Sequence, residues 1–310
     1  MSTRDEEPVA GAVDGTAAGA RGVREGGRPG WARSFWVRLP ALLVPLLGVE
    51  AATTGVNSLA DATPFTALLS GVGTAALALW AYVWLVRTVE GRGGPEELAL
   101  RDARSGVCRG ALLGLGLFGA TLGLIAACGG YRVAGWGSFG GAVTTLGLMC
   151  CVAVTEELVF RGALFRVLEE RTGTWGALAV SGVLFGALHL VNEGATVWGA
   201  LAIAIEAGLL FGAVYAATRS LWLPIGLHLG WNMAEGGIFG STVSGAGDGG
   251  TGLLDGAAHG AQAVSGGAFG PEASVFAIVV CLVPTVYFLA RARRLGRIRP
   301  RGGRDTATRG

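Results

Sequence analysis

Glutamate, arginine, histidine and asparagine recur at four-residue spacing in the second half of the chain, in a combination that can do hydrolytic chemistry. The first pattern is Glu156-Glu157 followed by Arg161. Residues four apart share a helix face, so Glu157 and Arg161 can pair. Glu156 lies about 100° round the helix from Glu157. The spacing therefore predicts one neutralised carboxylate and one that remains available as a general base.

Two further patterns supply imidazole and amide groups. Phe185 and His189 are four residues apart, and so are His228 and Asn232. Taken singly, each pattern has a plain structural explanation, such as a packed histidine, an interhelical hydrogen bond or surface charges at a helix end. The combination is more specific, because two of the three histidines lie in apolar segments that follow the Glu-Glu pair. The third, His259, falls in a polar loop and is not expected to belong to the site.

The composition indicates which kind of protein carries these patterns. The chain has 310 residues, of which 51% are hydrophobic and 15% charged, whereas a soluble domain usually has about 25% charged residues. The charges gather in the two tails and a few short loops. This distribution predicts an all-α, polytopic membrane helix bundle. The net charge of +2 gives no sign of a nucleic-acid partner.

The apolar runs predict about eight transmembrane helices, because a spanning helix needs roughly 20 mainly apolar residues. The expected spans are 39–56, 64–86, 110–127, 139–158, 175–190, 197–217, 221–239 and 273–290. The fifth and seventh are short and interrupted by polar residues.

Arginine placement predicts the orientation. All 24 basic residues are arginine, and arginine-rich segments alternate along the chain with loops that hold few or none. Because short arginine-rich loops stay inside, we expect both termini in the cytoplasm and a multi-pass protein of the cell membrane. The 55 glycines suggest a GC-rich bacterial source.

Six regions follow from these observations. We expect a disordered cytoplasmic tail, N-terminal transmembrane helices, a catalytic core, a flexible Gly-rich extracytoplasmic loop, a last transmembrane helix and an Arg-rich cytoplasmic tail. In that order they cover residues 1–33, 34–138, 139–240, 241–271, 272–291 and 292–310. The five cysteines show no Cys-x-x-Cys spacing and are interpreted as helix-packing residues.

Three more carboxylates fall in expected spans, namely Glu50, Glu206 and Glu235. A charged side chain is costly inside a bilayer. We interpret these residues as buried carboxyls between helices, with a polar lining of a substrate cavity as the alternative, above all for Glu206. None is placed in the catalytic set.

The ordered motifs Glu-Glu-x-x-x-Arg, Phe-x-x-x-His and His-x-x-x-Asn on membrane helices resemble the CPBP family, the CAAX-protease and bacteriocin-processing family also called Abi. The resemblance covers residues 139–240. It implies a glutamate-dependent intramembrane endopeptidase, related to type II prenyl-protein proteases, that acts on membrane-associated peptides or proteins. In a bacterial host a peptide or bacteriocin-like precursor is expected rather than a prenylated protein.

The resemblance also implies roles for the motif residues. Glu156 and His189 would activate a water molecule, and His228 and Asn232 would stabilise the oxyanion. The remaining three, Glu157, Arg161 and Phe185, would orient the site or hold the substrate.

Two questions stay open at this point, and the first is whether the site uses a metal. Glu156, His189 and His228 have the right donor types for a catalytic zinc. The helix motif His-Glu-x-x-His is absent, however, and Asn232 is a poor zinc ligand, so a metal-free site is expected.

The second question is whether the chain is a protease at all. A non-catalytic membrane immunity or regulatory protein also fits, and so does a transporter with a proton relay. No inverted repeat is visible to favour the transporter.

Overall fold

The expected all-α class is confirmed. The computed structural model describes residues 30–60, 63–246 and 252–302 of the chain, and helices dominate them. The longer helical elements are α1 (Phe35–Ala60), α2 (Pro64–Glu90), α3 (Ala103–Ala127), α4 (Phe139–Glu157), α5 (Arg166–Leu188), α6 (Val197–Ile203), α7 (Leu210–Thr218), α8 (Trp222–Asn232) and α10 (Val275–Arg294). The shorter ones are η1 (Gly30–Arg33), η2 (Glu96–Leu98), η3 (Leu100–Asp102), η5 (His189–Val191), α9 (Gln262–Ser265), η8 (Gly267–Phe269) and η9 (Pro271–Ala273).

The described residues include three π-helices, two of which interrupt helices that carry the sequence motifs. The three are η4 (Leu158–Phe165), η6 (Ala204–Leu209) and η7 (Met233–Ile238). Because a π-helix is rare and shifts the hydrogen-bond register of the helix, it commonly occurs at a functional site. Here η4 directly follows the Glu-Glu pair and η7 directly follows Asn232.

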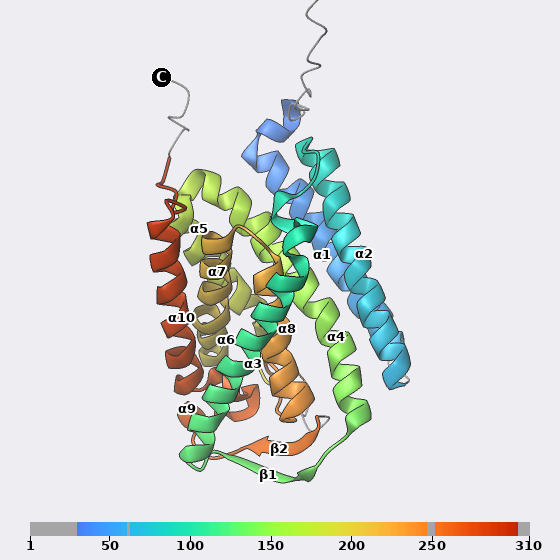
Figure 1. Cartoon of the computed structure of the whole chain (residues 1–310), viewed down its shortest axis with the longest axis vertical. Helices are drawn as coiled ribbons and strands as arrows, with labels where there is room; N and C mark the ends of the chain where they lie inside the picture. Colours follow the sequence, from blue (N-terminus) through green and yellow to red (C-terminus); the bar gives the residue numbers. More distant parts are fainter. Residues whose placement is uncertain (1–29, 61–62, 247–251, 303–310) are drawn as a thin grey trace, which may run out of the picture.

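The helices lie side by side along the long axis of the molecule (Figure 1). The described segments nearest the two termini are at the same end (Figure 1). A two-stranded antiparallel sheet closes the opposite end, where β1 (Tyr131–Trp136) pairs with β2 (Leu254–Ala258). This sheet ties the α3–α4 connection to the segment that precedes α10.

Six helical stretches of the described chain are long and apolar enough to cross a membrane, so the predicted count of eight is not confirmed. One of the six is the 53-residue stretch Phe139–Val191. It contains both the fourth and the fifth expected span, which are separated by the non-helical Gly173 (φ 72°, ψ 174°). The seventh expected span corresponds to α8 and η7 and is not among the six.

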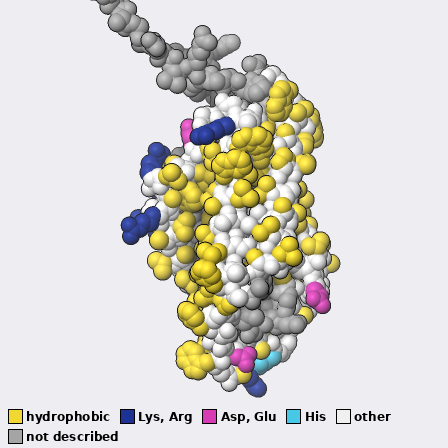
Figure 2. Space-filling view, turned by 90° about the vertical axis from the view of Figure 1, so that its right-hand side faces the viewer, with side chains coloured by type: hydrophobic (Ala, Val, Ile, Leu, Met, Phe, Trp, Pro, Cys, Tyr) yellow, Lys and Arg dark blue, Asp and Glu magenta, His cyan; other side chains and the backbone are white. Residues whose placement is uncertain are grey.

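The surface has the character expected of a protein in lipid. Hydrophobic side chains cover most of one face along its length, and charged ones lie mainly toward its ends (Figure 2). Large residues such as Val44, Trp80 and Val183 are more than 60% exposed. Because apolar surface left in water costs about 25 cal/mol per Å², these side chains belong in a bilayer. The chain is a multi-pass membrane protein.

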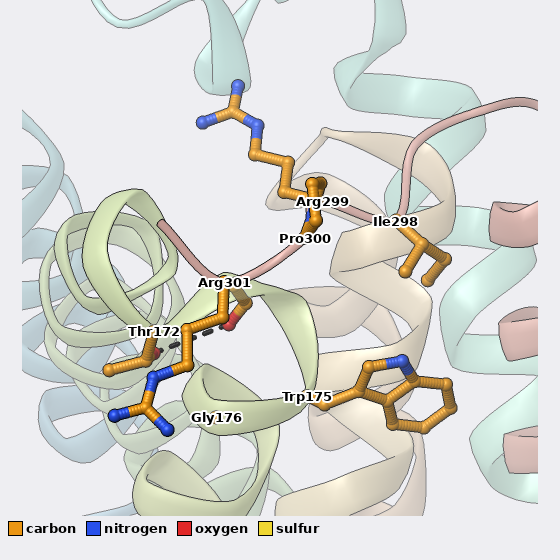
Figure 3. Close-up of a pocket in the computed structure, with 8 residues that line it drawn as sticks. Thr172, Trp175, Gly176, Ile298, Arg299, Pro300 and Arg301 are labelled. Atoms are coloured by element: carbon orange, nitrogen blue, oxygen red, sulfur yellow. Dashed lines mark hydrogen bonds between the residues drawn. The ribbon is translucent and has the colours of Figure 1, made fainter. Parts of the chain in front are cut away.

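The Gly-rich loop that was expected to be flexible is ordered where the structure describes it. Within 241–271, residues 252–271 form β2 and short helices, and Phe269 is fully buried. Part of the expected C-terminal tail also packs on the bundle, because the Arg299 backbone amide and carbonyl both bind Thr174 (2.8 and 3.0 Å). A cavity of about 670 Å³ lies between this tail segment and the start of α5 (Figure 3). The N-terminal tail, up to residue 29, lies outside the described residues.

Glycine brings the motif helices into backbone contact with their neighbours. A Cβ atom on Gly110 of α3 would lie 2.3 Å from the Leu223 carbonyl oxygen of α8, and one on Gly230 of α8 would lie 2.2 Å from that of Ala111. The same applies to Gly71 of α2, whose added Cβ would lie 1.8 Å from the carbonyl oxygen of Gly147 in α4. Small residues at such spacing are the usual means of close helix packing in membranes.

Replacement of Gly110 by leucine is expected to destabilise the protein, because the side chain collides with the α8 backbone. Overpacking of this kind costs about 1–3 kcal/mol, which will lower the melting temperature in detergent. Gly116→Leu in the same helix is the matched control, since nothing lies within 4 Å of its Cβ position. Equal melting temperatures for the two variants would contradict the backbone contact.

Candidate active site

The Glu157–Arg161 pair forms as the four-residue spacing predicts. Arg161 Nη1 donates to Glu157 Oε1 at 2.7 Å, and both side chains are fully buried. Separating two charges in such a place is expensive, because removal of one partner leaves the other uncompensated. Glu157 is therefore neutralised in place.

Backbone carbonyls and aromatic rings complete the surroundings of Arg161. Its Nη2 atom donates to the carbonyl oxygens of Ala207 and Gly208, both at 3.2 Å. These carbonyls belong to the π-helix η6, which presents two of them side by side. The guanidinium carbon lies 4.6 Å from the Phe185 ring centroid and 5.0 Å from that of Phe211. Both distances suit a cation–π interaction, which gives Phe185 its place in the site.

The π-helix η4 is held from outside by polar side chains. The Gly162 carbonyl oxygen accepts hydrogen bonds from the Tyr82 hydroxyl (2.9 Å) and from Arg166 Nε (2.7 Å). The Tyr82 hydroxyl also lies 2.6 Å from Glu97 Oε1, so its hydrogen is shared between two acceptors, and Arg166 pairs with Glu90 at 2.9 Å. Side chains outside the three motifs thus fix the turn that follows Glu156 and Glu157.

Glu156 is the free carboxylate of the pair and faces His228. Its Oε2 atom lies 4.0 Å from His228 Nε2 and has no hydrogen-bond partner among the described residues. The other ring nitrogen, His228 Nδ1, lies 3.5 Å from Glu157 Oε1. The imidazole of the third motif therefore stands between the two carboxylates of the first.

His189 is oriented by its own helix. Its Nδ1 atom lies 2.8 Å from the Phe185 carbonyl oxygen. A carbonyl oxygen can only accept, so Nδ1 carries the hydrogen and donates it, which leaves Nε2 as the acceptor in neutral imidazole. The structure does not place His189 within ion-pair distance of Glu156 among the described contacts, whereas it does so for His228. Of the two histidines, it is therefore His228 that the described ion-pair contacts place next to Glu156, whereas the sequence predicted His189.

Asn232 lies one turn beyond His228 on α8 and is buried. Its amide Nδ2 contacts Met149 Sδ of α4 at 3.3 Å. The helix is anchored next to this residue, because Trp231 Nε1 donates to Glu272 Oε1 (2.9 Å) and Ser244 Oγ donates to Glu272 Oε2 (2.6 Å). The segment between the third motif and α10 therefore holds α8 in position, a role that sequence reasoning missed.

Glu50 of α1 lies closer to the site than expected. It interacts electrostatically with both Glu156 and His189, and its Oε2 atom is buried without a hydrogen-bond partner. The remaining two carboxylates lie elsewhere. Glu206 Oε2 contacts Cys281 Sγ at 3.6 Å, and Glu235 interacts electrostatically with Glu272. No sequence signal linked Glu50 to the motifs, because helix periodicity says nothing about which helices become neighbours.

The geometry gives no ready metal centre. Within the described ranges, no group of three His, Cys, Asp or Glu side chains lies close enough together to hold a metal ion. Glu156, His189 and His228 are not drawn together as such a group. All five cysteines are free.

Comparisons with known proteins find one family model and a curated relative. Residues 138–234 match the family model described as type II CAAX prenyl endopeptidase Rce1-like. A stretch of 79 residues is 33% identical to the protein named "Putative membrane peptidase YdiL" of Bacillus subtilis (strain 168). That match covers 26% of this chain and 30% of the relative's length. No solved structure gives a significant match.

The matched segment is the one in which the structure brings together the residues of the three motifs. Glu156, Glu157 and His228 meet within 4.0 Å, and Arg161 holds one of the carboxylates. The sequence order, the geometry and the family match therefore point the same way. Over this segment, the chain is similar to the Rce1-like type II CAAX prenyl endopeptidases.

Proposed function

We propose that this protein is a membrane-embedded endopeptidase that hydrolyses peptide bonds of membrane-associated peptides or proteins. One observation carries the proposal. A buried carboxylate oxygen without a partner, Glu156 Oε2, faces a ring nitrogen of His228, while the adjacent Glu157 is neutralised by Arg161. A general base needs an ionisable group that is oriented but not compensated.

In the proposed reaction, water lies between Glu156 and the scissile carbonyl. The 4.0 Å between Glu156 Oε2 and His228 Nε2 is a separation that one water molecule can bridge. Glu156 takes one proton from this water while the water oxygen bonds to the carbonyl carbon, and His189 Nε2 accepts a hydrogen bond from the O–H that remains. Collapse of the tetrahedral intermediate breaks the C–N bond, and the Glu156 carboxyl returns the proton to the leaving amine.

His228 and Asn232 supply the donors for the oxyanion in this scheme. They lie one helical turn apart on α8, and both are buried. Donors fixed in a dry site before the reaction stabilise developing negative charge without reorganisation. The backbone contacts between α3 and α8 and the anchor at Trp231 provide that rigidity.

Replacement of Glu156 by glutamine is expected to abolish cleavage, because the amide cannot accept the proton. Asn232→Ala should reduce the rate about 10²–10³-fold, the usual cost of one oxyanion donor. The assay uses purified protein in proteoliposomes with a library of lipid-anchored peptides, read by mass spectrometry. His259→Ala is the matched control, since its ring lies near the sheet end of the molecule, next to β2. Cleavage by Glu156→Gln at the wild-type rate would refute the proposal.

Glu157→Gln is expected to lower the cleavage rate less than Glu156→Gln does, because Glu157 pairs with Arg161 and does not take the proton. Arg161→Met should instead act on stability, since it leaves Glu157 buried and unpaired at a cost of about 3–5 kcal/mol. Rates and melting temperatures of the three variants check both statements. The reverse order of the two glutamate variants would show that Glu157 is the base.

Treatment with a chelator is expected to leave the activity unchanged, because the proposed steps use only side chains and water. The measurement compares cleavage rates before and after dialysis against EDTA, and after zinc is added back. Loss of activity that zinc alone restores would replace this proposal by a zinc-dependent version with Glu156, His189 and His228 as ligands.

A further inference from the structure

A second cavity lies away from the motif residues, at the arginine-rich end of the molecule. Its volume is about 570 Å³. It is bounded by the first turns of α3, the α7–α8 connection, the last turns of α10 and the segment that follows α10. The residues that carry the argument are Asp102, Arg109, Leu223, Phe288, Arg291 and Arg297.

The charge of this cavity is predominantly positive. Arg109, Arg291 and Arg297 line it, against the single carboxylate of Asp102. Asp102 is exposed and already has a partner in Arg101, at 3.6 Å. Among the described residues, Arg109 and Arg291 have neither an ion pair nor a hydrogen bond to an acidic side chain. Two guanidinium groups thus share one cavity without a counter-charge from the protein.

The third arginine is fixed in place. The Arg297 guanidinium donates to the Ala217 carbonyl oxygen, and the Arg297 carbonyl oxygen accepts from Arg219. Arg219 is in turn paired with Glu169 at 2.5 Å. The segment after α10 is therefore tied to the end of α7, which keeps Arg297 at the rim of the cavity.

Apolar side chains line the remainder of the cavity. Leu113 and Leu223 come from α3 and α8, and Tyr287 and Phe288 come from α10. Both α3 and α10 are apolar enough to span a membrane, and only 33% and 28% of their most apolar windows are buried within the protein. The cavity therefore joins a cationic rim to helices whose flanks face lipid.

We propose that this cavity, defined by Arg109, Arg291 and Arg297, binds the headgroup phosphate of an anionic phospholipid. Guanidinium groups bind phosphate oxygens through paired, charge-assisted hydrogen bonds. Basic pockets between membrane helices bind anionic lipid headgroups in this manner. The apolar lining favours a lipid over a free phosphate ion, because it accommodates the start of the acyl chains. The site does not depend on the proposed peptidase activity.

The test uses the full-length protein purified in a mild detergent, with lipid binding measured by native mass spectrometry. Phosphatidylglycerol is titrated against phosphatidylcholine and against inorganic phosphate. The wild type should retain phosphatidylglycerol in preference to phosphatidylcholine. The double variant Arg109→Gln, Arg291→Gln should bind phosphatidylglycerol about ten- to thirty-fold more weakly, as expected for the loss of two charges near the membrane surface.

Arg104→Gln with Arg293→Gln is the matched control. It removes the same charge from the same two helices, α3 and α10, and neither residue lines the cavity. Equal weakening by the control and the double variant would overturn the site. If the wild type bound inorganic phosphate as tightly as phosphatidylglycerol, the ligand would be a soluble anion, and the proposal would be overturned.

A second measurement needs no variant. A photoactivatable phosphatidylglycerol, added to the wild type in nanodiscs, should label peptides from the start of α3 and the end of α10. Labelling spread evenly over α1, α2 and α10 would show bulk lipid contact only and would contradict the proposal.

Discussion

The buried ion pair between Glu157 and Arg161 constrains the rest of the site. Both side chains are withdrawn from solvent, and a guanidinium in such a place needs compensating groups close to it. One carboxylate binds Nη1, two carbonyls of η6 bind Nη2, and the rings of Phe185 and Phe211 lie near the guanidinium carbon. Three separate stretches of the chain must therefore converge on Arg161. That convergence also brings His228 between the two carboxylates.

Backbone irregularity and close backbone contact make this convergence possible. The π-helix η6 offers the Ala207 and Gly208 carbonyls to Arg161, and η4 offers the Gly162 carbonyl to Tyr82 and Arg166. The site is thus supported largely by main-chain carbonyl groups.

The sequence indicates the local relations of the site well and the long-range ones poorly. Spacing of four residues correctly predicts the Glu157–Arg161 pair, since helix geometry alone determines it. The motif order also predicts the family. Composition explained the glycines as a feature of the genome, but Gly110 and Gly230 are needed for helix contact. The proximity of Glu50 to Glu156, and the anchoring of Trp231 by Glu272, depend on tertiary packing that no local pattern encodes.

The glycine contacts have a consequence for how the bundle can deform. Where a side chain meets a side chain, a change of rotamer can absorb a small displacement. At Gly110 and Gly230, α3 and α8 meet through main-chain atoms, and main-chain atoms have no rotamers to change. The helix that carries His228 and Asn232 can therefore shift relative to α3 only by sliding as a rigid body, so that the spacing of the two donors is preserved through any such movement.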